Sequence, residues 1–376
     1  TIASIASSTI DGINYYLVPS NTIGYSVVAE GDYNGKFVIP SYIYDSKKRK
    51  YEVRGWALNA FTNCDNLTSI ELGAKTYDSS NYYTVSISNQ AFEGCNHLMN
   101  IYVNSSNNYF TSIDGVLYSK DKSTLRMFPT GRTGSFSIPD YVSSVGSMAF
   151  KYTNLEELTI PNSLYNFDDD FLGDCTKLTS IKVSESNSRY SSLNGVLYNK
   201  SQTAIVRYPV GKKGNVTIDK NIGSIQANAF AKCEIDSFIC NPNTKSIDLS
   251  AFDGAKIKYL YLDAAYSNYK FLEKLDESST VYVHYYEYDK AKKYLSGKLK
   301  TIEKYYVKEQ TEKLLGRVSF AAPANNCMYY DSTAPGAQQK PWNGYILKSI
   351  NINGQDIEAT KNNTFTIDGL LPDKNY

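Results

Sequence analysis

A short pattern of hydrophobic positions recurs along much of the chain. Each copy begins with two hydrophobic residues, usually Ala-Phe, has a small residue three positions later, and ends in spaced Leu, Ile and Val residues. The copies begin at Ala60, Ala91, Ala149, Phe171, Ala229 and Ala251. The aliphatic end alternates with polar residues, which predicts a short strand with one buried face. We expect a helical or 3₁₀ turn at the Ala-Phe step, so that each copy forms one coil.

A longer repeat contains these units. Residues 95–153 recur without a gap as residues 175–233, an offset of 80 (175 − 95), with 19 of the 59 aligned positions identical. Self-similarity at a fixed spacing indicates a repeat architecture. Because a single coil cannot bury its own Phe and Ile side chains, we expect the coils to stack with like residues above like.

The long repeat also carries an insert of its own. Residues 109–131 and 189–211 each contain Gly-Val-Leu-Tyr, then a polar stretch, then an apolar run that ends in Pro. This order predicts two β-hairpins. The first pairs Val116–Ser119 with 125–128, and the second pairs Val196–Asn199 with 205–208. We expect both hairpins to project from one side of the stack.

The flanks of the array lack the repeat. Residues 1–50 are strand-like and predict an N-terminal β cap over a solenoid at 51–266. Residues 267–305 predict a C-terminal cap, with a strand at 280–286 and a helix at 288–299. Residues 316–376 form a separate region with strand-like runs at Val318–Ala321, 345–351 and Thr364–Ile367.

The pattern Ala-Phe-x-x-Cys-x-x-Leu-x-x-Ile-x-Ile/Val, with the duplicated Gly-Val-Leu-Tyr-x-Lys block, resembles the BspA-type leucine-rich repeat. Thr153 and Ala255 depart from it at the Cys position. The resemblance implies a mixed α/β repeat, a leucine-rich-repeat solenoid of short strands and short helical turns with projecting β-hairpins. It also implies a bacterial cell-surface or secreted protein, of a kind that often binds host extracellular-matrix or plasma proteins.

The last residues resemble a second family. Leu370, Pro372 and Tyr376 match the Leu-x-Pro-x-x-x-Tyr corner of fibronectin type III and Ig-like sandwiches. The resemblance implies a β-sandwich over 316–376 that is incomplete, because the chain stops at this corner.

Composition narrows the function. The net charge of +1 gives no nucleic-acid footprint, and no apolar run reaches the length of a membrane span. The sequence has no Gly-x-Ser-x-Gly, P-loop, dinucleotide or Cys-x-x-Cys motif and only 2 His. We therefore predict no catalytic, cofactor or metal residue. The repeated Cys is expected to be a small buried residue, and a disulfide between Cys64 and Cys95 stays open as an alternative.

The chain has 34 Tyr, and Tyr offers a large rigid contact area for recognition. The candidate ligand contacts are Tyr82, Tyr83, Tyr109, Tyr118, Tyr190 and Tyr198. The alternative for Tyr118 and Tyr198 is packing across their own hairpins. The sequence favours a non-enzymatic binding protein, an adhesin that recognises host or partner proteins through the solenoid surface. A cell-surface glycan-binding protein of a bacterial polysaccharide uptake system is the alternative, and an enzyme on a repeat scaffold ranks third.

Overall fold

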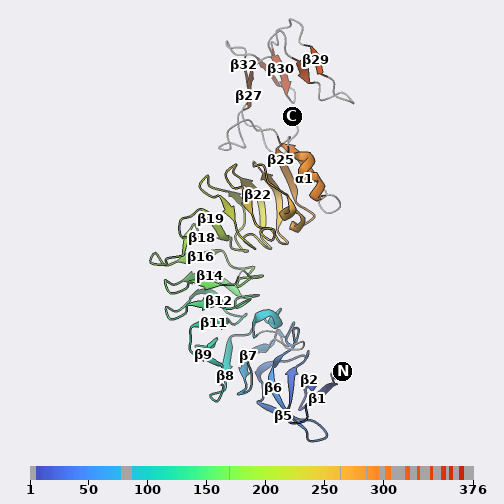
Figure 1. The fold of residues 1–376 in the computed structure, drawn as a ribbon, viewed down its shortest axis with the longest axis vertical. Helices are drawn as coiled ribbons and strands as arrows, with labels where there is room; N and C mark the ends of the chain where they lie inside the picture. The colour runs from blue at the N-terminus through green and yellow to red at the C-terminus, as the bar shows by residue number, and fades with distance from the viewer. Residues whose placement is uncertain are drawn as a thin grey trace.

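The computed structural model describes residues 6–77, 87–168, 170–262, 264–284, 287–295 and 301–305, together with short strands between 318 and 367. Figure 1 shows the N-terminal strands at one end, the repeat coils stacked along the long axis, and α1 (Tyr288–Leu295) beyond them.

The N-terminal strands form one five-stranded sheet. Its order is β1 (Ala6–Ile10), β2 (Ile13–Val18), β3 (Gly24–Val28), β6 (Lys50–Trp56) and β5 (Tyr42–Tyr44). Alternate residues point to opposite faces of a strand, and the inward set includes the buried Tyr15, Leu17, Ile43, Tyr51 and Val53. This face packs against the first coil, and we call the sheet the cap. The predicted division of the chain into domains stays a prediction.

Each coil contributes one strand to a parallel ladder, in three segments. The first is β4 (Gly35–Val38), β7 (Leu67–Leu72) and β8 (Asn100–Val103). The second is β12 (Thr133–Ser137), β14 (Asn154–Ile160) and β16 (Ser180–Val183). The third is β20 (Asn215–Thr217), β22 (Glu234–Cys240), β24 (Lys256–Leu262), β25 (Thr280–His284) and β26 (Thr301–Tyr305). Repeat positions pair directly, as Ile70 does with Ile101, which confirms the predicted strands.

The Phe residues of the units form the centre of the stack. Phe61 and Phe92 stack at 4.9 Å between ring centroids, and Phe230 and Phe252 lie 5.7 Å apart. At the Phe position of the units, Phe61, Phe92, Phe150, Phe230 and Phe252 are fully buried, and Leu172, which occupies this position in the fourth unit, is 2% exposed. The stacked solenoid is therefore confirmed. The turn at Ala91-Phe92 is the 3₁₀ helix η1 (Asn89–Phe92).

The inserts contain the predicted hairpins and one strand more. In the first insert, β10 (Val116–Ser119) pairs antiparallel with both β9 (Phe110–Ile113) and β11 (Thr124–Met127). In the second, β18 (Val196–Asn199) pairs in the same way with β17 (Tyr190–Leu193) and β19 (Ala204–Arg207).

The expectation that these hairpins project from the stack is wrong. β11 pairs in parallel with β13 (Ser144–Val145), which pairs with β15 (Asn166–Phe167), and β19 likewise begins a ladder with β21 (Ser224–Ile225) and β23 (Ser246–Ile247). The inserts thus begin a second ladder of the solenoid. The physical reason is their apolar content, because Leu117, Leu125 and Met127 are completely buried.

Phe128 and Tyr208, at the ends of the inserts, are also core residues and not surface aromatics. Phe128 lies 5.4 Å from Phe150, and Tyr208 lies 5.1 Å from Phe230. The coil that holds each insert has no Ala-Phe unit of its own. Phe128 and Tyr208 therefore take the place of the unit's Phe in the aromatic stack.

The C-terminal part continues the ladder. α1 contacts β25, β26 and the 3₁₀ helix η2 (Lys270–Lys274), and β25 and α1 lie close to the predicted strand and helix. Further on, β27 (Val318–Ala321) pairs with β32 (Thr364–Ile367), β28 (Met328–Tyr330) with β29 (Gln339–Pro341), and β30 (Ser349–Ile352) with β31 (Gln355–Glu358). The Leu-Pro-Tyr corner lies outside the described residues, so the sandwich stays a prediction. Among the described helices, none combines the length and the apolar character that a bilayer span requires.

Candidate binding surface

The outer face of the N-terminal sheet carries aromatic and charged side chains. Glu52 in β6 is the register partner of both Tyr25 in β3 and Tyr42 in β5. Register partners point to the same face of a sheet, and Arg54, two residues further along β6, shares that face. The strand alternation that buries Tyr51 and Val53 therefore sets these four side chains outward.

Cations lie over the rings on this face. The Arg54 guanidinium is 4.7 Å from the Tyr25 ring centroid and 5.5 Å from that of Tyr77. The Lys50 and Lys75 ammonium groups are 3.7 Å and 5.7 Å from the Tyr42 centroid. Cations over aromatic faces hold both partners in place at modest energetic gain.

Glu52 provides the negative charge between these cations. Its carboxylate lies 3.2 Å from Arg54 and 3.8 Å from Lys75. The Tyr42 side chain, followed by the Glu52 carboxylate, raises the pKa of Lys75, so its ammonium stays charged throughout the physiological range. The face therefore has a net positive charge with its aromatic rings held in fixed positions.

The face continues from the cap onto the first coil. The Tyr77 amide donates to the Arg54 carbonyl at 3.1 Å, and the Tyr77 ring lies 5.1 Å from the ring of Tyr109. Tyr109 is 52% exposed. We define the tyrosine–cation face by the residues Tyr25, Tyr42, Arg54, Lys75, Tyr77 and Tyr109.

A buried asparagine positions Tyr109. The Asn107 amide nitrogen donates to the carbonyls of Gly73 and Thr76 at 2.8 and 2.9 Å. Its Oδ1 accepts from the backbone amides of Tyr109 and Phe110 at 2.8 and 2.9 Å. All four bonds of the side chain are thus satisfied, and they fix the entry to β9 against the preceding coil.

The second long repeat contains the same clamp. Asn187 donates to the carbonyls of Pro161 and Leu164 at 2.7 and 2.9 Å, and accepts from the amides of Arg189 and Tyr190. Tyr77 and Tyr165 each follow a residue whose carbonyl accepts from the asparagine, so the two are equivalent. Tyr109 and Arg189 are equivalent because the amide of each donates to the asparagine Oδ1. A local signal for this clamp exists in the sequence, because asparagine occupies both positions at the 80-residue offset (187 − 107). The residue type alone does not reveal that the side chain is buried and fully hydrogen-bonded.

The structure separates the six candidate tyrosines. Tyr109 lies on the exposed face, whereas Tyr82 and Tyr83 lie outside the described residues. Tyr118 is only 2% exposed, in contact with Tyr141 at 5.9 Å, and burial raises the pKa of its phenol. A ligand contact at Tyr118 was therefore a wrong prediction, because its ring fills the core of the second ladder.

The other two tyrosines are half-buried. Tyr190 stacks on Phe167 at 4.7 Å, and Tyr198 packs against the hydrophobic core. Burial raises the pKa of Tyr198. Neither side chain belongs to the tyrosine–cation face, and their roles as ligand contacts stay predictions.

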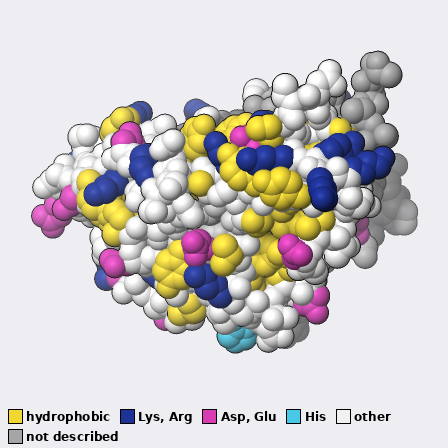
Figure 2. All heavy atoms as spheres, turned by 90° about the horizontal axis from the view of Figure 1, so that it is seen from below, with side chains coloured by type: hydrophobic (Ala, Val, Ile, Leu, Met, Phe, Trp, Pro, Cys, Tyr) yellow, Lys and Arg dark blue, Asp and Glu magenta, His cyan; other side chains and the backbone are white. Residues whose placement is uncertain are grey.

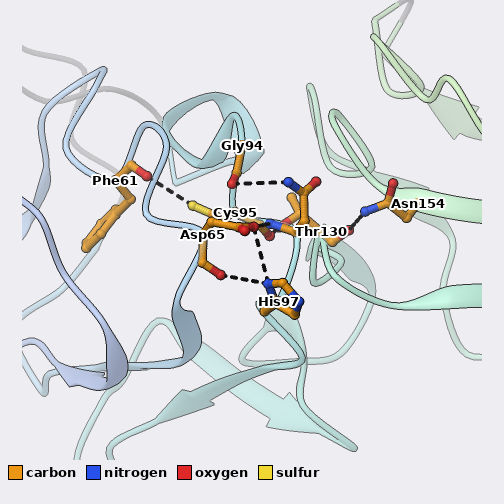
Figure 3. A network of polar contacts seen from close by, with 8 residues as sticks. Phe61, Asp65, Gly94, Cys95, His97, Thr130 and Asn154 are labelled. Carbon is orange, nitrogen blue, oxygen red and sulfur yellow. Dashed lines mark hydrogen bonds and ion pairs between the residues drawn. The ribbon is translucent and has the colours of Figure 1, made fainter.

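The repeated cysteines connect neighbouring coils through hydrogen bonds (Figure 3). The Cys95 thiol donates to the Phe61 carbonyl at 3.0 Å, and the Cys175 thiol donates to the Phe150 carbonyl at 2.9 Å. Cys64 and Cys95 are both free thiols, so the alternative of a disulfide between them is wrong. Burial raises the pKa of Cys95 to about 12.

The hydrogen bonds in Figure 3 run across several coils. Thr130 Oγ1 donates to the Cys95 carbonyl at 2.7 Å, and Asn154 donates to the Thr130 carbonyl at 3.0 Å. At the surface end, His97 Nδ1 lies 2.9 Å from the carbonyl oxygen of Asp65. Each of these groups is hydrogen-bonded to a neighbouring coil, so the network stabilises the stacking of the coils.

Charges of both signs are distributed over the surface. Seen from the N-terminal end, basic, acidic and hydrophobic side chains are interspersed (Figure 2). In the part of the chain that the structure describes, no group of three or more His, Cys, Asp or Glu side chains is placed to hold a metal ion. The described surface thus offers tyrosine rings beside the Arg54 guanidinium, and aromatic residues and Arg are enriched at protein interfaces.

Comparisons with solved structures give several matches. A leucine-rich repeat protein from Eubacterium ventriosum is 17% identical, with 74% of this chain and 78% of that chain covered and a TM-score of 0.39. The pneumococcal vaccine antigen PcpA is 14% identical, with 81% and 100% covered and a TM-score of 0.38. A leucine rich cell surface protein from Faecalibacterium prausnitzii is 17% identical, with 81% and 96% covered and a TM-score of 0.32.

No curated protein matches the chain. The family description "BspA type Leucine rich repeat region (6 copies)" matches residues 52–119, 126–207 and 211–281, which together are more than half of the chain. This match confirms the resemblance drawn from the Ala-Phe units, and the chain belongs to the BspA-type leucine-rich-repeat family.

Proposed function

We propose that this chain is a non-enzymatic binding protein of the bacterial cell surface, an adhesin that recognises a host extracellular-matrix or plasma protein. One observation carries the proposal, namely that the outer face of the cap and the first coil presents the exposed Tyr109 and three half-buried tyrosines interleaved with cations. Tyr and Arg are the residues most enriched among those that dominate binding energy at protein interfaces.

The arrangement of the face supports this role. Its rings are held from both sides, by the Arg54 guanidinium between Tyr25 and Tyr77 and by the Asn107 clamp behind Tyr109. Side chains that are already ordered lose less conformational entropy when a partner binds. The face also includes residues of both the cap sheet and the first coil, so that one protein partner can contact both.

The region 316–376 has a separate place in the proposal. We propose that it begins an Ig-like or fibronectin type III-like sandwich that follows the solenoid. The antiparallel pairing of β27 with β32, the first and last of its described strands, supports this assignment.

A binding assay tests the adhesin proposal. The purified chain is measured by biolayer interferometry against immobilised extracellular-matrix and plasma proteins. For a partner that binds saturably, Tyr109→Ala and Arg54→Ala should each weaken affinity about tenfold or more, which corresponds to roughly 1.4 kcal/mol. Tyr141→Ala is the matched control, because this ring is 47% exposed but lies outside the face.

Two results would count against the proposal. One is the absence of saturable binding to every protein of the panel. The other is a partner for which the two face variants bind as tightly as the Tyr141→Ala control.

A further inference from the structure

A groove opens beside β8, where the first insert interrupts the parallel ladder. It has a volume of about 330 Å³, within the roughly 300–1,000 Å³ of small-molecule sites. The side chains that matter for its chemistry are Tyr102, Asn104, Ser105, Phe110, Thr111 and Asp114.

Some residues that line the groove form hydrogen bonds that fix its shape. Ser112 Oγ donates to the Ile101 carbonyl at 2.5 Å, and the Lys120 ammonium donates to the Asn107 carbonyl at 2.6 Å. Arg132 donates to the Asp114 carbonyl. These bonds tie both walls to the solenoid, so the groove is preformed.

Other polar groups are left available. Within the described residues, the hydroxyls of Ser105 and Thr111 and the carboxylate of Asp114 make no hydrogen bond to the protein. Tyr102 in β8 is 42% exposed and adds an aromatic surface. The groove thus combines one ring with several unused hydroxyl and carboxylate oxygens on a fixed backbone.

We propose that this groove binds one neutral pyranose residue of a glycan. The tyrosine ring, whose centroid lies 5.8 Å from the Lys36 ammonium, is a platform for the C–H face of a sugar, and the free oxygens pair with the sugar's hydroxyl groups. The Asp114 carboxylate repels an anionic sugar. The nearby cations already have partners, since the Lys120 ammonium donates to a carbonyl and the Lys36 ammonium pairs with the Glu71 carboxylate at 2.8 Å. The inference goes beyond the proposed adhesin function, because Tyr102 does not belong to the tyrosine–cation face.

The second long repeat provides an internal comparison. At the 80-residue offset, Tyr102 is replaced by Lys182, whose ammonium pairs with Glu157 at 2.8 Å. Thr111 is replaced by Ser191, whose hydroxyl donates to the Asn199 carbonyl at 2.9 Å. The same backbone arrangement therefore exists without the ring and without the free hydroxyl, so the sugar site is specific to the first copy.

The comparison defines the test. The full chain is titrated with cellobiose, maltose, lactose and mannobiose, and with glucuronic acid as the anionic probe, by saturation-transfer NMR. At least one neutral disaccharide should bind saturably, and Tyr102→Lys should weaken it about tenfold or more. This variant introduces the residue that the second copy already accommodates, so we expect it to fold. Tyr165→Ala, at a ring 53% exposed outside the groove, should bind like the parent.

Three results would overturn the inference. They are the absence of binding by every neutral disaccharide, equal binding by the parent and Tyr102→Lys, and a preference for glucuronic acid. Binding of the protein panel by Tyr102→Lys separates this site from the adhesin proposal, because that variant should keep its protein affinity.

Discussion

Replacing Asn107 with alanine should loosen the junction between the first coil and the first insert. The side chain is completely buried and makes four hydrogen bonds, two as donor and two as acceptor. Each such bond contributes about 0.5–1.5 kcal/mol net. The substitution should therefore lower the free energy of unfolding of this region by roughly 2–6 kcal/mol, a large share of the roughly 5–15 kcal/mol typical of a domain.

Hydrogen exchange measures this loss locally, which matters because repeat proteins need not unfold in one step. The amides of Tyr109 and Phe110 donate to Asn107 Oδ1, so their exchange should accelerate by a factor of about ten or more. Asn187→Ala should have the same effect on the amides of Arg189 and Tyr190, because its four bonds have nearly the same lengths.

The neighbouring Asn108 is the matched control, since it is exposed and Asn108→Ala removes no buried hydrogen bond. The reasoning is refuted if Asn107→Ala and Asn108→Ala have the same stability and the same exchange at Tyr109 and Phe110.

Three further predictions concern the solenoid. Phe92→Ala should cost roughly 3–5 kcal/mol in chemical unfolding, because it removes a ring stacked on Phe61; a cost below about 1 kcal/mol would contradict the stack. Gly131→Ala should destabilise the fold even though alanine is a small residue, because a Cβ there would lie 2.7 Å from the Leu98 nitrogen; an unchanged melting temperature would argue against that close approach. Burial raises the pKa of Cys95 and Cys175 from 9.0 to about 12, so their contribution to stability should be full below about pH 9 and be lost as the pH rises toward 12. The free energy of unfolding of Cys95→Ala should fall less steeply between pH 9 and 12 than that of the parent. An equally steep fall in both proteins would refute this prediction.

The stacked coils could be predicted from the sequence because every unit repeats the same hydrophobic pattern. Phe61 and Phe92 occupy equal positions in their units, and stacking is the only way for one coil to cover the ring of the next. The hairpin strands around Val116 and Val196 followed from the same reasoning.

The position of the inserts could not be predicted from that pattern. Whether β10 points outward or into the stack depends on β11 pairing with β13, a contact between chain segments that the local alternation does not encode. The preceding strand β9 did have a local signal. Asp114-Gly115 forms a two-residue turn with φ of 49° and 72°, and Asp-Gly between strands indicates a tight hairpin.

The tyrosine–cation face could not be predicted from the sequence, because it also depends on contacts between separate chain segments. Tyr109 was identified from its residue type, but its neighbours Arg54 and Tyr25 come from the cap sheet, where register decides which side chains face out. Tyr118 was misjudged because one exposed and one buried tyrosine in the same insert look alike until the packing is known.

Hydrogen exchange of the chain in complex with a matrix or plasma partner tests the central claim most directly. The claim predicts slower exchange in β3, β6 and the segment that holds Tyr77 and Tyr109, where the tyrosine–cation face lies. Protection confined to the second long repeat, with the cap and the first coil unchanged, would contradict it.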